Sequence, residues 1–491
     1  MQGRECTVNR VAPTANSIRD TIAMHPNAVL LRGGTVLDCD GERRADLRVG
    51  PDGRVAAVAP ALPPEPGEPV VQCNDRLVVP GGVDVHTHLH LPVGQLQVSD
   101  DFLTGTIAAA IGGTTTIVDY VTAYRGEDPL NALRTWRRWA EPACVDYGLH
   151  MTLTERVPER TIATCVEAGI TSFKLYMAYP ELLQVDDDVI AEVMATTRKY
   201  GAFVTLHCES GGAIEALRRR ALAEGRTGVM EHALTRPAQL EADAVARAAA
   251  LAERANTSVY VVHLSSAPGL AEVRNARERG IDVIAETCPQ YLYLDTARLA
   301  DPDGASYVCT PPLRDPWHVE ELWHGLATGA VQTVATDHCP FTVADRRAGV
   351  HRRAGGFADF TEIPGGLPGI ETRMGLVWEG VAAGRLARAD WVRLCAEAPA
   401  RTFGLWPAKG NLRAGADADI VVWDPARGQS LDAPDLHMAV DHSPYHGMTV
   451  TGWPETVLGR GTVIARDGHY VGEPARGRYF PRAAAGARDG V

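Results

Sequence analysis

Two histidines one residue apart, His86 and His88, close an apolar run that begins at Val78. Alternate residues of a β-strand share one face, so both imidazoles can point the same way from the end of a buried strand. Two imidazoles on one face supply half of a metal site, because imidazole nitrogen is a common ligand of zinc and related cations. The other ligands must then come from neighbouring strands.

Further side chains of this chemical type end other apolar runs. Lys174 lies inside SFKLYMAY, and His207, His263 and Asp337 each close a short apolar stretch. Singly, each has a structural alternative: a strand-end histidine can be a hydrogen-bonded core residue, a lysine can pair with a glutamate, and an aspartate can cap a helix. Taken together with the histidine pair, they predict one ring of metal ligands.

The lysine indicates what chemistry such a ring performs. A buried ammonium beside metal ions is disfavoured, whereas a neutral Lys174 amine can add CO2 and become a carbamate that bridges two cations. Two divalent cations would share a hydroxide, because metal binding lowers the pKa of water. Asp337 would ligate one metal, accept the proton of the attacking group and pass it to a leaving nitrogen. The predicted reaction is metal-assisted hydrolysis of an amide-like bond.

Eight apolar runs that alternate with amphipathic or alanine-rich helices must position these residues. This alternation predicts an α/β fold, a (β/α)8 TIM barrel, whose active site lies at the carboxyl ends of the strands. The expected strands are Val78–His86, Thr115–Tyr120, Gly148–Thr152, Ser172–Met177, Phe203–His207, Val259–His263, Asp282–Glu286 and Thr333–Asp337.

Short strands and turns flank the predicted barrel on both sides. Hairpin signals occur at Asp40-Gly41 and Asp52-Gly53, and the same pattern returns after Lys409. We therefore expect one β-sandwich domain formed by the N- and C-terminal segments. The expected divisions are a flexible N-terminal extension (1–26), the N-terminal sandwich segment (27–79), the barrel (80–408), the C-terminal sandwich segment (409–472) and a C-terminal tail (473–491).

The composition is that of a soluble globular protein, with 45% hydrophobic and 22% charged residues among 491. A formal charge of −13 argues against a nucleic-acid partner. We find no signal-peptide pattern and no apolar run long enough to cross a membrane. The ten cysteines form no C-x-x-C pair, which favours reduced, mostly buried thiols and a cytoplasmic protein.

The motifs resemble those of the cyclic amidohydrolases of the amidohydrolase superfamily, in the dihydropyrimidinase and D-hydantoinase branch, over about residues 28–480. This resemblance implies two Zn²⁺ per subunit, an N6-carboxylated lysine and usually a homotetramer. The motifs that carry it are GGVDVHTH, FKLYMAY, LHCE, VHLSS, ETCPQYL, PPLR, ATDHCP, IPGGLPGIETRM and GADADIVVWDP.

The resemblance also implies a role for each residue of the ring. Carboxylated Lys174 would bridge the two metals, and Tyr179 would hydrogen-bond the developing oxyanion; the alternative for Tyr179 is a packing residue at the barrel rim. The family's first zinc would be held by His86, His88 and Asp337, and its second by His207 and His263.

Four further residues bear on the substrate. Thr310 and Gly365 stand where hydantoinases usually have Ser and Asn, and the family contacts substrate through the main chain there. Tyr176, two residues after the lysine, would line the pocket for the ring substituent and make it more polar than a Phe would. His90 stands where dihydroorotases carry Arg, which argues against that branch; it would be a donor behind the ligands or a substrate contact.

The leading hypothesis is hydrolysis of hydantoins or dihydropyrimidines, which are small cyclic ureides, to N-carbamoyl amino acids. The enzyme alternative is allantoinase, which converts allantoin to allantoate. It is kept because the segment HSPYHGM is closer to the corresponding allantoinase motif than to that of the hydantoinases. The non-enzyme alternative is a dihydropyrimidinase-related scaffold; such proteins lack part of the metal ring, whereas this chain keeps all six residues. We expect neither a nucleic-acid partner nor a membrane partner. The expected oligomeric state is a homotetramer or a dimer.

Overall fold

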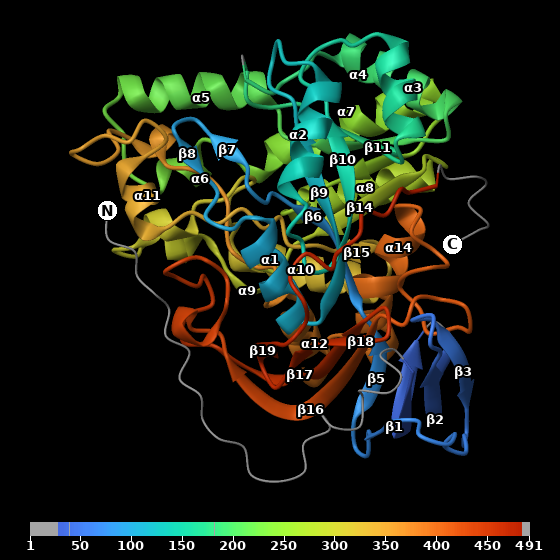
Figure 1. Ribbon diagram of the computed structural model, residues 1–491. Coiled ribbons are helices and arrows are strands. Elements are labelled where there is room, and N and C mark those ends of the chain that lie inside the picture. The colour runs from blue at the N-terminus through green and yellow to red at the C-terminus, as the bar shows by residue number, and fades with distance from the viewer. Residues whose placement is uncertain (1–27, 39, 181, 484–491) are drawn as a thin grey trace.

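The computed structural model describes residues 28–38, 40–180 and 182–483. The expected N-terminal extension (1–26), Cys6, Cys39 and the last portion of the expected C-terminal tail lie outside the described residues. Two sheets organise the described chain (Figure 1): an eight-stranded parallel sheet surrounded by helices, and a nine-stranded sheet formed by both ends of the chain.

The eight-stranded sheet confirms the predicted barrel. Its strands follow the order β15-β14-β13-β12-β11-β10-β9-β6, and a parallel bridge between Thr87 and His338 nearly closes the circle. Nearly every strand residue is buried, because helices cover the outside and side chains fill the inside. The strands are β6 (Gly82–Thr87), β9 (Thr114–Thr122), β10 (Asp146–Thr152), β11 (Ser172–Tyr176), β12 (Phe203–His207), β13 (Val259–Val261), β14 (Val283–Thr287) and β15 (Thr333–Val334).

The helices pack small apolar residues against this barrel. In α1 the side chain of Asp101 accepts hydrogen bonds from the first-turn amides of Leu103 and Thr104, which starts the helix. The longer helices are α1 (Phe102–Ile111), α2 (Pro129–Trp139), α3 (Glu159–Glu167), α4 (Asp187–Lys199), α5 (Gly211–Ala223), α7 (Ala238–Ala255), α8 (Ala267–Glu278), α10 (Pro316–Ala327) and α12 (Arg373–Ala382). The short ones are α6 (Glu231–Leu234), α9 (Gln290–Tyr293), α11 (Val343–Ala348), α13 (Arg388–Val392) and α14 (Ala398–Thr402).

The nine-stranded sheet confirms that both ends of the chain build one β unit. Its order is β19-β18-β17-β16-β5-β1-β2-β3, with β4 paired to β1. The junction is antiparallel pairing of β5 with β16, so its strands form one continuous sheet. The strands are β1 (Val29–Asp38), β2 (Gly41–Val49), β3 (Val55–Ala59), β4 (Val70–Gln72), β5 (Leu77–Pro80), β16 (Ile420–Ser430), β17 (Thr449–Gly459), β18 (Thr462–Arg466) and β19 (His469–Tyr470). The remaining strands, β7 (Pro92–Val93) and β8 (Leu96–Gln97), form a separate hairpin.

The run expected as one strand, Val78–His86, is divided between the two sheets. The chain leaves β5 and starts β6 at Gly81, where a Cβ atom would lie 2.1 Å from the Thr115 hydroxyl oxygen. Only glycine allows this close approach, so the break in the strand follows from Gly81.

Two expected strands are shorter than their apolar runs. β13 ends at Val261 and β15 at Val334, so His263 and Asp337 lie just beyond the strands. Both have left-handed backbones, with φ of 38° and 52°. Such values are uncommon for residues with a side chain and interrupt the two-residue alternation of a strand.

The segment before residue 483 closes the amino end of the barrel. The amide of Phe480 donates to the Tyr147 carbonyl at 2.7 Å, and that of Arg482 donates to Gly169 at 3.0 Å. The guanidinium of Arg482 is buried and donates to the hydroxyl of Ser172 at 2.8 Å. This segment is therefore packed against the barrel.

An ionic cluster joins the barrel to the sheet at the same end. The ammonium of Lys409 lies 2.6 Å from Asp146, 3.0 Å from Asp417 and 2.7 Å from Asp419. Because Asp146 begins β10 and the other two precede β16, the cluster connects the two sheets.

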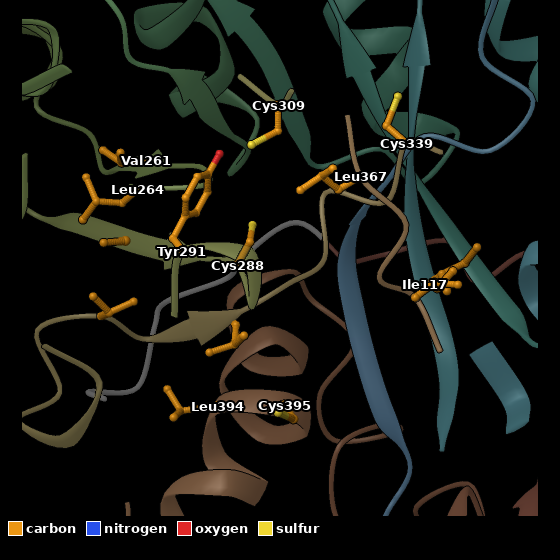
Figure 2. Packing of buried hydrophobic residues seen from close by; sticks show 14 of the residues in the cluster. Ile117, Val261, Leu264, Cys288, Tyr291, Cys309, Cys339, Leu367, Leu394 and Cys395 are labelled. Carbon is orange, nitrogen blue, oxygen red and sulfur yellow. The ribbon is translucent and has the colours of Figure 1, made fainter. Parts of the chain in front are cut away.

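The eight cysteines in the described part of the chain are all buried, and none of these eight pairs with another. Figure 2 shows Cys288, Cys309, Cys339 and Cys395 among the hydrophobic side chains. Within residues 28–38, 40–180 and 182–483, no helix is both long and apolar enough to cross a membrane.

Candidate metal centre and active site

The six predicted metal ligands come together at the carboxyl ends of the barrel strands. They line one cavity of about 560 Å³ and each is buried. The predicted ligands are His86 near the end of β6, His88 just after β6, Lys174 in β11, His207 at the end of β12, His263 after β13 and Asp337 after β15.

Three of these residues converge on one point. The Nε2 atoms of His86 and His88 lie 3.0 and 3.1 Å from the same carboxylate oxygen of Asp337. Ligand atoms of all three residues lie within 4.8 Å of one another. Two imidazoles and a carboxylate at this spacing fit a divalent cation such as zinc.

Glu286 orients the first of these histidines. Its carboxylate accepts from His86 Nδ1 at 2.6 Å, and it also accepts from the hydroxyl of Tyr260 at 2.8 Å. With its proton held on Nδ1, His86 presents the lone pair of Nε2 toward Asp337. Burial works against a charged His86, but Glu286 and Asp337 raise its pKa to about 9, so the space between Nε2 and Asp337 favours a cation, which is either a second proton or a metal ion that accepts the lone pair.

His207 and His263 form the second group of predicted ligands. His207 Nδ1 lies 2.8 Å from His263 Nε2, while the other ring nitrogen of His207 contacts the Glu209 carboxylate at 2.9 Å. Burial is the main cause that lowers the pKa of each imidazole, which favours the neutral, ligating form. The rings of His86 and His263 are 5.5 Å apart, so the two groups are neighbours.

Lys174 is fully buried, and its ammonium has no hydrogen-bond partner among the described residues. Its Nζ atom lies 5.1 and 4.9 Å from the ring centres of Tyr120 and Tyr176. Burial lowers the pKa of Lys174 to about 8, although Asp337 and Glu286 favour the charged form. An amine whose pKa is lowered and that has no hydrogen-bond partner in the described chain loses its proton more readily, which is what carboxylation requires.

Asp337 is held in its ionised form. Burial alone would raise its pKa, but His86 and His88 outweigh that effect and hold it well below its usual range. An ionised carboxylate at this position can ligate a cation and accept a proton.

Four of the five predicted substrate residues line the same cavity: Tyr176, Tyr179, Thr310 and Gly365. The centre of the Tyr179 ring lies 5.3 Å from that of the His207 ring. The backbone of Tyr179 is left-handed, with φ of 66°, so its side chain does not continue the two-residue alternation of the preceding strand. A Cβ atom on Gly365 would lie 3.1 Å from the Thr310 hydroxyl, so the two positions are in close contact.

His90 is placed elsewhere. Its φ is 59°, and its ring packs 4.5 Å from that of Trp139 on α2. His90 is not one of the described residues that line the cavity. The structure therefore does not bring His90 together with His86 and His88.

A sequence profile of the amidohydrolase family matches residues 77–464. The chain belongs to this family. It is 43% identical over 463 residues to a D-hydantoinase of Streptomyces coelicolor, a match that covers 92% of this chain and 98% of that relative. A D-hydantoinase of Geobacillus stearothermophilus is 42% identical over 465 residues, which cover 93% of this chain and 97% of the relative.

Solved structures of hydantoinases share the fold of this amidohydrolase. A crystal structure of dihydropyrimidinase from Brevibacillus agri is similar at a TM-score of 0.89 and 38% identity, and covers 94% of this chain and 100% of that one. L-hydantoinase from Arthrobacter aurescens is more distant, at a TM-score of 0.82 and 28% identity over 92% of this chain and 99% of that one.

Sequence reasoning missed three residues that support the site of this amidohydrolase. Glu286 and Glu209 orient His86 and His207, and His232 donates from Nε2 to the Cys309 carbonyl beside Thr310 at 2.9 Å. The signals were present: Glu209 follows His207 by two residues in LHCE, and Glu286 opens ETCPQYL at the end of a strand.

Proposed function

We propose that this amidohydrolase hydrolyses the ring amide of hydantoins or dihydropyrimidines to give N-carbamoyl amino acids. The observation that carries the proposal is the buried Lys174 amine, which has no hydrogen-bond partner in the described chain and lines the same cavity as both groups of predicted ligands. Relatives named D-hydantoinase and D-phenylhydantoinase support the substrate class.

We further propose that two zinc ions are held by the six-residue ring, with N6-carboxylated Lys174 between them. When bound, such cations polarise a carbonyl and lower the pKa of water toward neutrality. His86 and His207 would present the ring nitrogens that their glutamates leave unprotonated.

Asp337 would carry the proton during the reaction. Its carboxylate is ionised and lies at the cavity wall beside His86 and His88, where it can accept a proton from the attacking water. It can then return that proton to the ring nitrogen that leaves, which completes the ring opening.

Tyr179 would stabilise the developing oxyanion. Burial raises the pKa of its hydroxyl above the usual range, so the group keeps its proton and can donate it in a hydrogen bond. We propose that the main chain at Thr310 and Gly365 holds the ring amide, and that Tyr176 faces the ring substituent. For His90, which packs on Trp139, we propose an indirect role through that contact and no direct contact with the ligands.

We also propose a cytoplasmic homotetramer. The buried thiols of the eight described cysteines support a reducing compartment, and the resemblance to the cyclic amidohydrolases supports the tetramer. Light scattering of the purified protein measures the mass directly, and a monomeric mass would contradict the tetramer.

A turnover screen tests the proposed function. Purified protein with added zinc is assayed with 5-phenylhydantoin, dihydrouracil and allantoin, and its metal content is measured. We expect two metals per chain and faster turnover of the first two compounds than of allantoin. Preferential hydrolysis of allantoin would establish the allantoinase alternative, and a chain that binds no metal and turns over none of the three would support the scaffold.

A further inference from the structure

The cavity has two chemically different walls beyond the metal ligands. One wall is apolar, and the other is basic and comes from α5 and from the turn between α6 and α7. The apolar wall comprises Leu91, Val93, Leu182, Leu183 and Ile363. The basic wall comprises Arg218, Arg219 and Arg236, with Glu215 as its one carboxylate among the described lining residues.

Arg236 supplies an unpaired donor at the inner end of the basic wall. Its side chain is 6% exposed, and its Nε has no hydrogen-bond partner in the described part of the chain. The nearest carboxylate is Glu209, whose oxygen lies 3.9 Å from Nε and already contacts His207 at 2.9 Å. A buried guanidinium with an unused N–H is costly unless a ligand accepts from it.

Arg218 and Arg219 share one carboxylate farther along the same wall. Arg218 Nη1 donates to Glu215 at 3.0 Å, and Arg219 Nη1 lies 3.7 Å from the other oxygen of Glu215. Burial and the neighbouring charge of Arg236 lower the pKa of Arg218, which is the response of a cation that lacks full neutralisation. This wall therefore carries an excess of positive charge.

We propose that the basic wall selects cyclic ureides whose ring substituent ends in a carboxylate, such as a hydantoin bearing a carboxyethyl group. This inference rests on the proposed function and specifies its substrate class. The methylene groups of the substituent lie along the apolar wall, and the carboxylate accepts hydrogen bonds from Arg218 and Arg236.

The chemistry of guanidinium favours this ligand. Its planar fork of N–H groups matches a carboxylate, and partial enclosure reduces the screening that weakens exposed ion pairs. A neutral amide of the same shape offers these charged donors one acceptor oxygen and no negative charge, so it would satisfy them less well than a carboxylate does. Loss of a hydrogen bond to a charged group predicts a preference on the order of 10- to 100-fold.

The experiment compares 5-(2-carboxyethyl)hydantoin with its neutral amide, 5-(2-carbamoylethyl)hydantoin, and measures kcat/KM for each. We expect the wild-type protein to prefer the acid by at least about 10-fold and to lose most of this preference in Arg218→Gln. The preference should also fall as salt concentration rises. Equal kcat/KM values for the two compounds in the wild-type protein would overturn the inference.

Two other variants of α5 separate the wall from the general charge of the helix. Arg220→Gln removes the same charge from a side chain that is 73% exposed, pairs with Glu224 and does not line the cavity, so the preference should be unchanged. Glu215→Gln removes the competing carboxylate, so the preference for the acid should increase. A loss of preference in Arg220→Gln equal to that in Arg218→Gln would also contradict the inference.

A binding measurement distinguishes failure of this inference from failure of the proposed function. N-carbamoylglutamate and N-carbamoylglutamine are titrated calorimetrically into the wild-type protein and into Arg218→Gln, which requires no turnover. If no hydantoin were hydrolysed, the proposed function would fail, and the basic wall would still be tested here. Tighter wild-type binding of the glutamate compound supports the inference, and equal binding of the two overturns it.

Discussion

The two ends of the barrel each bury a lysine, and the two lysines differ in what surrounds them. Lys409 at the amino end is 1% exposed and has three carboxylates within 3.0 Å. Lys174 at the carboxyl end is 0% exposed, and its ammonium has no hydrogen-bond partner in the described chain. The sequence holds only three lysines, and the third, Lys199, is exposed on α4.

Burial alone does not distinguish a structural charge from a reactive one. A buried charge with a complete set of partners holds elements together, as Lys409 holds β10 to the loop before β16. A buried charge without partners has a shifted pKa and remains available for chemistry or for a ligand, as at Lys174. Substitution of Lys174 should therefore lower activity and metal content, whereas substitution of Lys409 should lower the free energy of unfolding. Substitution of the exposed Lys199 is the matched control for both.

The largest effect is expected at the carboxyl end. Lys174→Ala should lower kcat/KM roughly 1,000-fold or more, because loss of the metal ions removes several kcal/mol of transition-state stabilisation. Metal content should fall with it, and short carboxylates such as propionate should partly restore activity. Metal analysis and hydantoin kinetics measure both effects, with Lys199→Ala as control. A Lys174→Ala protein that retains two metals and full turnover would falsify the bridging role.

At the amino end of the barrel we expect substitution of Lys409 to lower stability and to leave catalytic activity unchanged. Lys409→Met removes the cation shared by three buried or half-buried carboxylates, of which Asp146 keeps its contact with Arg460, and it should lower the free energy of unfolding by about 3–5 kcal/mol. Urea denaturation measures this change against Lys199→Met. The folded fraction should keep its metal and its kcat. If Lys409→Met instead lost metal while remaining as stable as the wild type, the division between the two ends would be wrong.

Acidic pH should lower the stability of the folded protein through His232, which lies at the carboxyl end of the barrel. Burial and the charge of Arg236 lower the pKa of His232 to about 3, whereas the unfolded chain protonates this residue near 6.5. Between these values the unfolded state binds more protons, so stability falls as pH falls, by about 1.4 kcal/mol per pH unit from this group. Unfolding midpoints from pH 7 to pH 4 should therefore depend less on pH in His232→Gln. Identical slopes in the wild-type protein and in His232→Gln would contradict the assignment.

The smallest effect concerns the substituent pocket at the carboxyl end. Tyr176→Phe removes one hydroxyl from the cavity wall and should shift the preference between polar and apolar 5-substituted hydantoins by about 2- to 10-fold toward the apolar ones. Ratios of kcat/KM for a matched pair of hydantoins measure the shift. An unchanged ratio would show that the Tyr176 hydroxyl does not contact the substituent.

The features that could be predicted from sequence were those that depend on local periodicity. Alternation placed His86 and His88 on one face, and the positions of Lys174 within its apolar run and of His207 at the end of another predicted the same rim for both. His90 shows where this reasoning stops. It shares the period of the other two histidines, yet a left-handed backbone at φ 59° turns its ring toward Trp139.

Contacts between distant segments could not be predicted in the same way. Glu286 is 200 residues from His86, and Arg236 and Arg218 reach one wall from different elements. The left-handed φ values of His263 and Asp337 likewise depend on surrounding packing, since neither residue type requires them.

The sequence by itself determined which ligands could be predicted for the site, because residue type and two-residue spacing fix what a strand can present at its end. Only the tertiary structure decided their chemical state. The barrel brings Glu286 to His86 and Asp337 to both strand-end histidines, and it encloses Lys174 without a partner within the described chain. Protonation depends on desolvation and on neighbouring charge, and both arise only when distant segments of the chain pack together.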